Sequence, residues 1–315
     1  MRIQPFAAEH AEPAALLALR NYEDVRQYVP ALPPVAAWPD LTGFAANGMG
    51  VAALDGDELL GFLCAVPPFG NAFRSTDAIG VFSPMHANGA IQKDRAHIYA
   101  RMIEEAGAIW AQAGASSHAV CLYAYDCEGQ QQFFRYGYGL RCIDAIRYIK
   151  EIDACPCEGF DFCELPIEGH ARVLPLVHLL DGHMAASPTF ILRASATEAS
   201  FLEDIAESRS RLFVAQINGQ IAAFIRAQPE GETFVCDMPG YLHVTGAFCL
   251  PEYRGKSIYQ GLFNHLLCTL KAEGYTRLGV DFESLNPAAH GFWLKYFDAY
   301  TYGLVRRVDE HVLTR

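Results

Sequence analysis

Long apolar runs are missing from this sequence. No stretch approaches the roughly 18 apolar residues that span a bilayer, although apolar residues make up 51% of the 315. The first ten residues lack a basic segment followed by an apolar one, so no secretory signal is predicted. The 17 prolines and 26 glycines are scattered, which argues against disordered or low-complexity segments. We therefore expect a compact cytoplasmic protein with no membrane partner.

Positive charge is also scarce. The chain has 24 Lys and Arg against 36 Asp and Glu, a formal net charge of −12. Such a balance disfavours nonspecific attraction to nucleic-acid phosphates. We expect no nucleic-acid partner, and a cationic or amine-bearing small molecule fits this charge better.

Paired cysteines of the Cys-x-x-Cys type do not occur. Most of the ten cysteines lie inside apolar runs, which predicts buried, reduced thiols. Cys155, Cys157 and Cys163 lie close together, but their spacing lacks the two matched pairs of a structural zinc site. We predict no metal and interpret this stretch as a connection between domains.

What the sequence does contain is an internal repeat. Its length suits two domains of about 150 residues each, and the halves align at a nearly constant offset of 160. The matching pairs are Gly114 with Gly274, Asp126 with Asn286, Phe133 with Trp293, Arg135 with Lys295 and Arg147 with Arg307. This repeat predicts two copies of one fold.

Each half shows the same order of elements. Apolar runs surround Asp55-Gly56 in 51–65 and Asn218-Gly219 in 213–227, and this pattern predicts hairpins. In the second half a strand at 241–250, an amphipathic helix from Ile258 to Leu270, and a strand at 277–282 should follow. Asn286-Pro287 should begin a short helix, and 300–310 reads as a closing strand. This order predicts a mixed α/β sheet.

Two motifs carry a family resemblance. Pro251, Arg254 and Gly255 match the pattern Pro-x-x-Arg-Gly-x-Gly-x-Gly/Ala. A second pattern, Asn-x-x-Ala-x-x-Phe-Tyr-x-Lys-x-Gly-Phe, is matched in part by Asn286, Ala289, Phe292, Trp293 and Lys295. Together they resemble the GNAT superfamily of N-acetyltransferases, well over 165–315 and in outline over 1–150. We expect two tandem GNAT-like domains: a degenerate copy at 1–150, a linker at 151–164, and a domain with an acetyl-CoA site at 165–315.

The resemblance implies a set of cofactor contacts. A helix N-terminus binds phosphate through free N–H groups and the helix dipole. By the resemblance the diphosphate is held by Arg254, Gly255, Lys256, Ser257 and Ile258. Backbone groups of Ala247 and Phe248 should lie at a bulge near Gly246, Asn286 should bond the pantetheine arm, and Trp293 should pack beside it. Ser257 and Tyr259 replace smaller family residues.

The first half lacks Arg-Gly-x-Gly. Between Val81 and His97 the loop is longer, with 30 positions from Pro84 to Gly114 against 23 from Pro251 to Gly274. We expect its phosphate cradle to be remodelled or lost, and the first half to shape the substrate cleft or to pack against its partner.

An amine acceptor must lose a proton before it attacks, because alkylammonium groups are protonated at neutral pH. Asp281 and Glu283 share one face of a strand, and Glu283 is the preferred base. The alternatives are that both carboxylates face solvent or pair with Arg277 or Arg307. His243 is either another base or a structural residue.

The departing thiolate is often protonated in this family by a tyrosine, whose place Trp293 takes here. Tyr296, Tyr300 or Tyr302 could substitute, with Tyr296 as our catalytic candidate. Alternatively the thiolate leaves unaided, since a thiol pKa is about 8.5.

The function implied is transfer of acetyl from acetyl-CoA to a primary amine of a small molecule or peptide. A noncatalytic acyl-CoA-binding or regulatory protein is the alternative, and another acyl or aminoacyl donor is a third. The segments 28–38 and 180–190 are the expected acceptor walls. The oligomeric state stays open, with a homodimer among the options.

Overall fold

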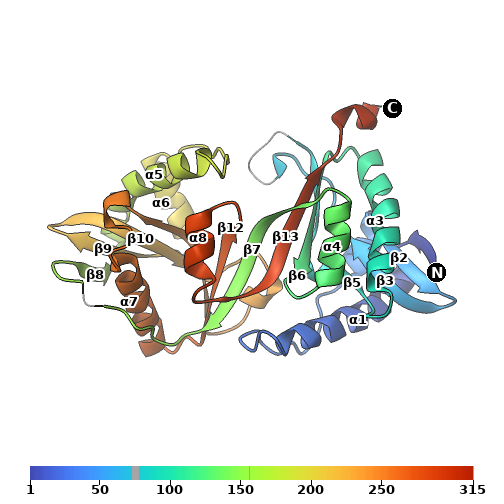
Figure 1. The fold of residues 1–315 in the computed structure, drawn as a ribbon, viewed down its shortest axis with the longest axis horizontal. Helices are drawn as coiled ribbons and strands as arrows, with labels where there is room; N and C mark the ends of the chain where they lie inside the picture. The colour runs from blue at the N-terminus through green and yellow to red at the C-terminus, as the bar shows by residue number, and fades with distance from the viewer. Residues whose placement is uncertain (73–77, 156, 315) are drawn as a thin grey trace. The chain divides into compact units, whose positions relative to one another are not determined.

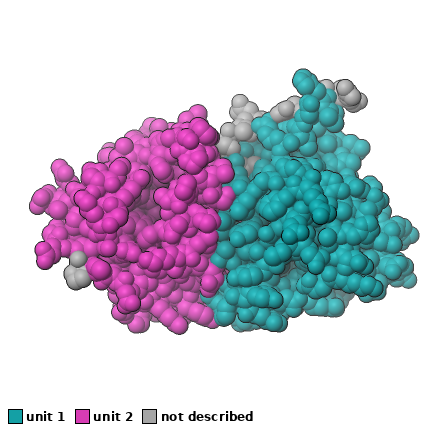
Figure 2. Space-filling view, viewed as in Figure 1, with its two compact units in different colours: residues 1–144, 299–315 teal, residues 145–298 magenta. Residues whose placement is uncertain are grey.

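The computed structural model describes residues 1–72, 78–155 and 157–314. Two compact units make up the chain: residues 1–144 with 299–315, and residues 145–298 (Figure 2). These units differ from the division expected from the sequence, because the closing segment 299–315 lies in the first unit and residues 145–164 lie in the second.

In the first unit helices and strands alternate along the chain, as the sequence predicts. Its elements are β1 (Arg2–Pro5), α1 (Ala8–Arg26), α2 (Thr42–Asn47), β2 (Gly50–Asp55), β3 (Glu58–Cys64), β4 (Gly80–Ser83), β5 (Asn88–Ala90), α3 (Arg95–Gln112), β6 (Ser117–Tyr123), α4 (Cys127–Arg135), β7 (Gly139–Tyr148) and β13 (Asp298–Arg307). β7 continues into the second unit after Asp144.

Strands of the first unit pair in two groups. β1, β2, β3 and β5 form an antiparallel sheet in that order. β4 runs parallel to β6, and β13 runs antiparallel on the other side of β6 (Figure 1). The β6–β13 register joins Ser117–Tyr123 to Thr301–Arg307 without a break. This ladder is the physical reason that the last strand belongs to the first unit.

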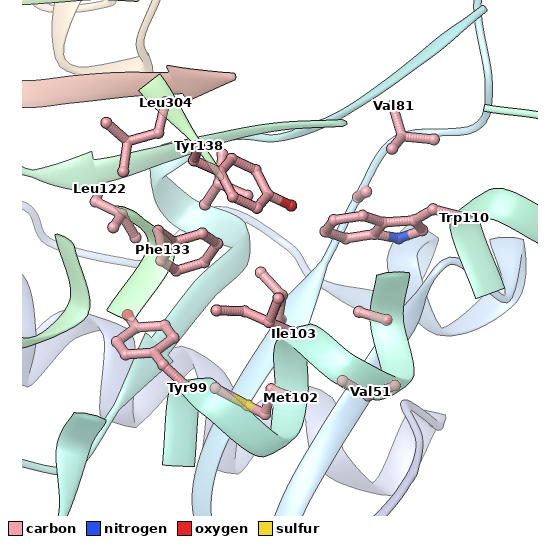
Figure 3. Close-up of a cluster of buried hydrophobic side chains, with 14 of the residues drawn as sticks. Val51, Val81, Tyr99, Met102, Ile103, Trp110, Leu122, Phe133, Tyr138 and Leu304 are labelled. Carbon is pink, nitrogen blue, oxygen red and sulfur yellow. The ribbon is translucent and has the colours of Figure 1, made fainter. Parts of the chain in front are cut away.

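The core of the first unit gathers on α3. Figure 3 shows Tyr99, Ile103 and Trp110 of this helix with Phe133 of α4 and Leu304 of β13 in one cluster. All five side chains are at most 1% exposed. Each fully buried aromatic or leucine side chain contributes roughly 1.5–3 kcal/mol, so β13 takes part in the packing as well as the ladder.

The second unit has a similar succession of elements, with the single strand β11 where the first unit has β4 and β5. Its elements are β8 (Asp161–Glu164), α5 (Leu174–Ala185), α6 (Glu198–Glu207), β9 (Arg211–Ile217), β10 (Gln220–Gln228), β11 (Tyr241–Cys249), α7 (Ile258–Ala272), β12 (Arg277–Glu283) and α8 (Pro287–Trp293). Strands follow the order β12-β11-β10-β9-β8, with only the β11–β12 pair parallel. The mixed α/β fold is therefore confirmed.

Local signals in the second unit act as predicted. Asn218 and Gly219 both have positive φ, at 52° and 77°, as a tight hairpin turn of this composition requires. The α7 stripe Ile258, Leu262, Leu266 and Leu270 is buried, and Gly274 follows the helix with φ of 87°.

The cysteines are all free thiols. Cys64, Cys121, Cys236 and Cys249 are buried, whereas Cys155 is exposed. The Cys157 thiol points to the backbone oxygen of Ser257 at 3.6 Å, and Cys163 accepts from the Gln216 amide at 3.7 Å. Among the described residues, no helix combines the length and apolar character that crossing a membrane requires.

Candidate functional site

The parallel ladder between β11 and β12 ends early. It joins Tyr241–Val244 to Arg277–Val280, and β11 then continues along β10 alone. Arg226 of β10 faces Gly246 while Ala227 faces Val244, so Thr245 is an extra residue in β11. This is a β-bulge, and the prediction of a bulge beside Gly246 is confirmed. Backbone groups of Ala247 and Phe248 follow it, beyond the last β11–β12 pair.

The turn after β11 leads directly into α7. Gly255 has φ of 72° and Ser257 has φ of 62°, both left-handed. No side chain of the described residues caps the N-terminus of α7, so its first N–H groups remain available to a ligand. Alternating left-handed residues before such a helix form a concavity of N–H groups suited to an anion.

The two cations of this turn lie on its flank. The Arg254 guanidinium donates from Nε to the Cys249 carbonyl oxygen at 2.9 Å and lies 5.2 Å from the centre of the Phe248 ring. The Lys256 ammonium lies 5.9 Å from the Tyr253 ring. Both side chains belong to exposed residues, and Ile258, the first residue of α7, is buried.

Asn286 caps the N-terminus of α8. Its Oδ1 accepts from the Ala288 and Ala289 N–H groups at 3.2 and 3.4 Å, which makes it the N-cap. His183 Nε2 lies 3.4 Å from the same oxygen. His183 of α5 thus brings the predicted acceptor wall at 180–190 to the edge of the candidate site.

Aromatic rings fill the space between α7 and α8. Trp293 is 4% exposed and packs edge-on against Tyr259, Phe263 and Phe292 at ring distances of 5.0–6.1 Å. The Tyr259 hydroxyl is buried and has no hydrogen-bond partner among the described residues. Burial raises the pKa of Tyr259 well above its usual range, with a further contribution from Cys249. A buried hydroxyl without a partner costs about 1–3 kcal/mol.

A buried polar chain crosses the paired part of β11 and β12. His243 Nε2 lies 2.9 Å from Asp281 Oδ1, and its Nδ1 lies 2.7 Å from the Tyr241 hydroxyl. Cys236 Sγ is 3.2 Å from that hydroxyl. Burial alone would lower the pKa of His243, but hydrogen bonds to Asp281 and Cys236 and the Asp281 charge raise it to about 10.

This network places the candidate bases in different environments. The His243 side chain is fully buried, whereas that of Asp281 is 25% exposed. His243 is therefore a hydrogen-bond partner of Asp281, which the sequence alone had left open. Sequence reasoning missed the pair because it depends on the β11–β12 register, which sets His243 beside Gly279, two residues before Asp281.

Gly279 makes room for the network, and this yields a first prediction. A methyl group at Gly279 would lie 1.8 Å from the Tyr241 hydroxyl and 2.7 Å from His243 Nδ1. We expect Gly279→Ala to lower the free energy of unfolding by about 3 kcal/mol, measured by urea denaturation. Gly291→Ala in α8, with open space around it, is the control and should raise it by roughly 0.5–1 kcal/mol. Equal effects of the two substitutions would refute the steric argument.

The remaining predicted catalytic residues lie at the ends of their elements. Glu283 is the last residue of β12 and is half-buried. Tyr296 follows α8, and its hydroxyl accepts from the Gln260 amide of α7 at 2.9 Å. Tyr300 and Tyr302 belong to β13 in the first unit.

Comparison with known proteins agrees with this geometry. Residues 180–298 match the model of the acetyltransferase (GNAT) family. A GCN5-related N-acetyltransferase from Sphaerobacter thermophilus is similar with a TM-score of 0.58 and 13% identity, covering 97% of this chain and 95% of that one. No curated protein sequence matches significantly.

Two other solved structures are similar with lower scores. A GCN5-related N-acetyltransferase from Kribbella flavida has a TM-score of 0.41 and 12% identity, with coverage of 99% and 72%. A tandem GNAT protein from the clavulanic acid biosynthesis pathway has a TM-score of 0.44 and 11% identity, with coverage of 97% and 98%. Residues 180–298 thus match the GNAT acetyltransferase family, and the chain shares the fold of a GCN5-related N-acetyltransferase.

Proposed function

We propose that the second unit transfers acetyl from acetyl-CoA to a primary amine of a small molecule or peptide. Acyl transfer follows from the family of residues 180–298, and the donor and acceptor are our proposal. The observation that carries it is the uncapped α7 N-terminus, preceded by left-handed Gly255 and Ser257, directly after the bulged end of β11.

The residues present fit an acyl-CoA. The N–H groups of Ser257 and Ile258 would hold the diphosphate with the Gly255 turn, and Arg254 and Lys256 would supply positive charge beside it. Coenzyme A, when bound, supplies the acetyl thioester. Backbone groups of β11 that continue beyond β12 would bind its pantetheine amides.

Asp281 is the proposed entry point for the amine proton. Its carboxylate is partly exposed, and the buried His243 behind it carries a raised pKa. A positively charged His243 orients the Asp281 carboxylate, which accepts a hydrogen bond from the incoming amine, and Glu283 or water then takes the proton. Glu283, on the same strand face, is the second carboxylate that this route would use.

Tyr259 is our candidate partner for the thiol end of the cofactor. Its hydroxyl is buried without a partner, whereas the Tyr296 hydroxyl already accepts from Gln260. A tyrosine hydroxyl can donate to a leaving sulfur. Trp293, which lies where the family usually has tyrosine, packs against the Tyr259 ring, so the two positions share one aromatic cluster.

The test is calorimetric titration with acetyl-CoA. We expect micromolar binding by the natural protein and by Lys93→Glu, an exposed charge reversal in the first unit. Arg254→Glu should weaken binding at least about tenfold, because it replaces a cation beside the diphosphate with an anion. Absence of acetyl-CoA binding by the natural protein would refute the proposal.

A second function is a noncatalytic acyl-CoA-binding protein, favoured by the ring cluster of Tyr259 and Trp293 in place of the usual small and hydroxyl-bearing residues. Release of free thiol in the presence of a panel of amines distinguishes the two. Binding without any amine-dependent thiol release would favour this second function.

A further inference from the structure

The first unit holds a cavity of about 360 Å³. It is built from the end of α1, the turn before α3, and the segment from β6 to α4. In the repeat this is the counterpart of the candidate site of the second unit, since Asp126 aligns with Asn286 and α3 also begins after a left-handed residue, Asp94 with φ of 55°. Its chemistry, however, is different.

The base of the cavity is an internally neutralised ion pair. Arg95, in the first turn of α3, donates to the Asp126 carboxylate at 2.7–2.9 Å. It also donates to Asn21 Oδ1 at 2.7 Å and to the backbone oxygens of Ala90 and Ile91. All three guanidinium nitrogens are thus engaged, and both side chains are 5% exposed. Arg95 therefore has no donor left for a phosphate.

The outer part of the cavity is acidic. Asp24 and Glu128 are exposed carboxylates that line it, and Arg95 is the only Lys or Arg among its lining residues. Gln27, the C-cap of α1, also lines it, so the negative end of the α1 dipole lies here. The N-terminus of α4 is already covered by Asp126, which accepts from the Gly129 N–H at 3.0 Å. The free charge at this cavity is negative.

Aromatic surface accompanies the carboxylates. Tyr28 and Tyr125 line the cavity and stack at 4.9 Å with an interplanar angle of 16°. Tyr28 is 63% exposed and Tyr125 is 45% exposed. Tyrosine faces attract organic cations, and their ring surface also contacts alkyl chains.

A buried hydroxyl completes the site. Tyr123 lines the cavity and is 6% exposed, yet its hydroxyl has no hydrogen-bond partner among the described residues. A buried hydroxyl that lacks a partner is destabilising, and a ligand that supplies one gains that free energy on binding. This observation is independent of the acidic rim and points to a polar group on the ligand.

We propose that the cavity of the first unit binds a small organic ammonium ion that also carries a hydroxyl or carbonyl group. The ammonium group pairs with Asp24 and Glu128, the carbon chain contacts Tyr28 and Tyr125, and the polar group bonds the Tyr123 hydroxyl. The first unit is then a separate ligand-binding module, and its ligand is an amine rather than a nucleotide-containing anion. This inference does not depend on the reaction proposed for the second unit.

Titration calorimetry of the full chain with 5-amino-1-pentanol tests the proposal. We expect saturable binding, and at least about tenfold weaker binding of the uncharged 1,5-pentanediol, because a charge-assisted hydrogen bond contributes roughly 1.5–3 kcal/mol. The double variant Asp24→Asn/Glu128→Gln should also weaken 5-amino-1-pentanol binding at least tenfold. The matched double variant Glu12→Gln/Glu105→Gln removes two exposed carboxylates of the same unit outside the cavity and should bind normally.

Tyr123→Phe gives the second readout. It should weaken 5-amino-1-pentanol several-fold and leave pentylammonium, which has no hydroxyl, unchanged. Equal binding by both carboxylate double variants would overturn the proposal, as would absence of binding. Binding of inorganic pyrophosphate that competes at the same residues would overturn it in favour of an anion site.

Discussion

Asp126→Asn is expected to lower the free energy of unfolding by about 3–5 kcal/mol, because it leaves the Arg95 charge buried without its counter-ion. Asparagine keeps the shape of the side chain and can still cap α4 through its oxygen. The effect therefore isolates the charge. Urea denaturation at pH 7 followed by circular dichroism measures it.

A control variant and a double variant test whether the loss of stability comes from the buried charge. Asp57→Asn removes an exposed carboxylate from the β2–β3 turn of the same unit and should change stability by less than about 0.5 kcal/mol. Arg95→Met/Asp126→Leu removes both charges and should recover much of the loss, since apolar replacement of a buried ion pair is often tolerated. A single Asp126→Asn variant within 1 kcal/mol of the natural protein would show that the pair carries no such energy.

The second large effect is the pH dependence of stability that His243 creates. Its folded pKa of about 10 lies above the ordinary histidine value of about 6.5. The folded protein therefore holds this proton more tightly than the unfolded chain, so the stabilisation is complete below pH 6.5 and is lost as the pH rises through 10. We expect the unfolding free energy to fall steadily between pH 7 and 10.

Asp281→Asn should remove most of that slope, because the carboxylate holds the proton on His243. The same variant should be less stable than the natural protein at pH 7 and should lose most acyl transfer to amines. Urea denaturation at pH 7 and pH 9.5 measures the slope. Asp161→Asn, an exposed carboxylate on β8, is the control and should keep it. An unchanged slope in Asp281→Asn would contradict the assignment of the shifted pKa to this pair.

Sequence reasoning was most successful where the signal is local. The Asn218-Gly219 hairpin, the α7 stripe from Ile258 to Leu270 and the α8 cap at Asn286 each depend on a few neighbouring residues. The bulge beside Gly246 also followed from one glycine in an otherwise bulky strand. Such features are fixed by backbone preference and by the period of apolar residues.

Features that depend on distant residues were missed. The pairing of His243 with Asp281 requires the parallel register of β11 and β12. Arg95 looks like an ordinary first-turn residue of α3 until Asp126, 31 positions later, is brought beside it. The buried hydroxyls of Tyr123 and Tyr259 have no hydrogen-bond partner among the described residues. No sequence pattern predicts this, because the lack of a partner depends on three-dimensional packing.

The place of β13 in the first unit has a consequence for synthesis of the chain. The ribosome makes residues 1–144 first, but the strand that pairs with β6 and contributes Leu304 to the core follows only after the whole of 145–298. Until then β6 presents one unpaired edge, which is prone to wrong pairing. The second unit can fold as soon as it emerges, whereas closure of the first must wait, and its large sequence separation slows that step. Of the two units, the one that is synthesised first is thus the one that finishes folding last.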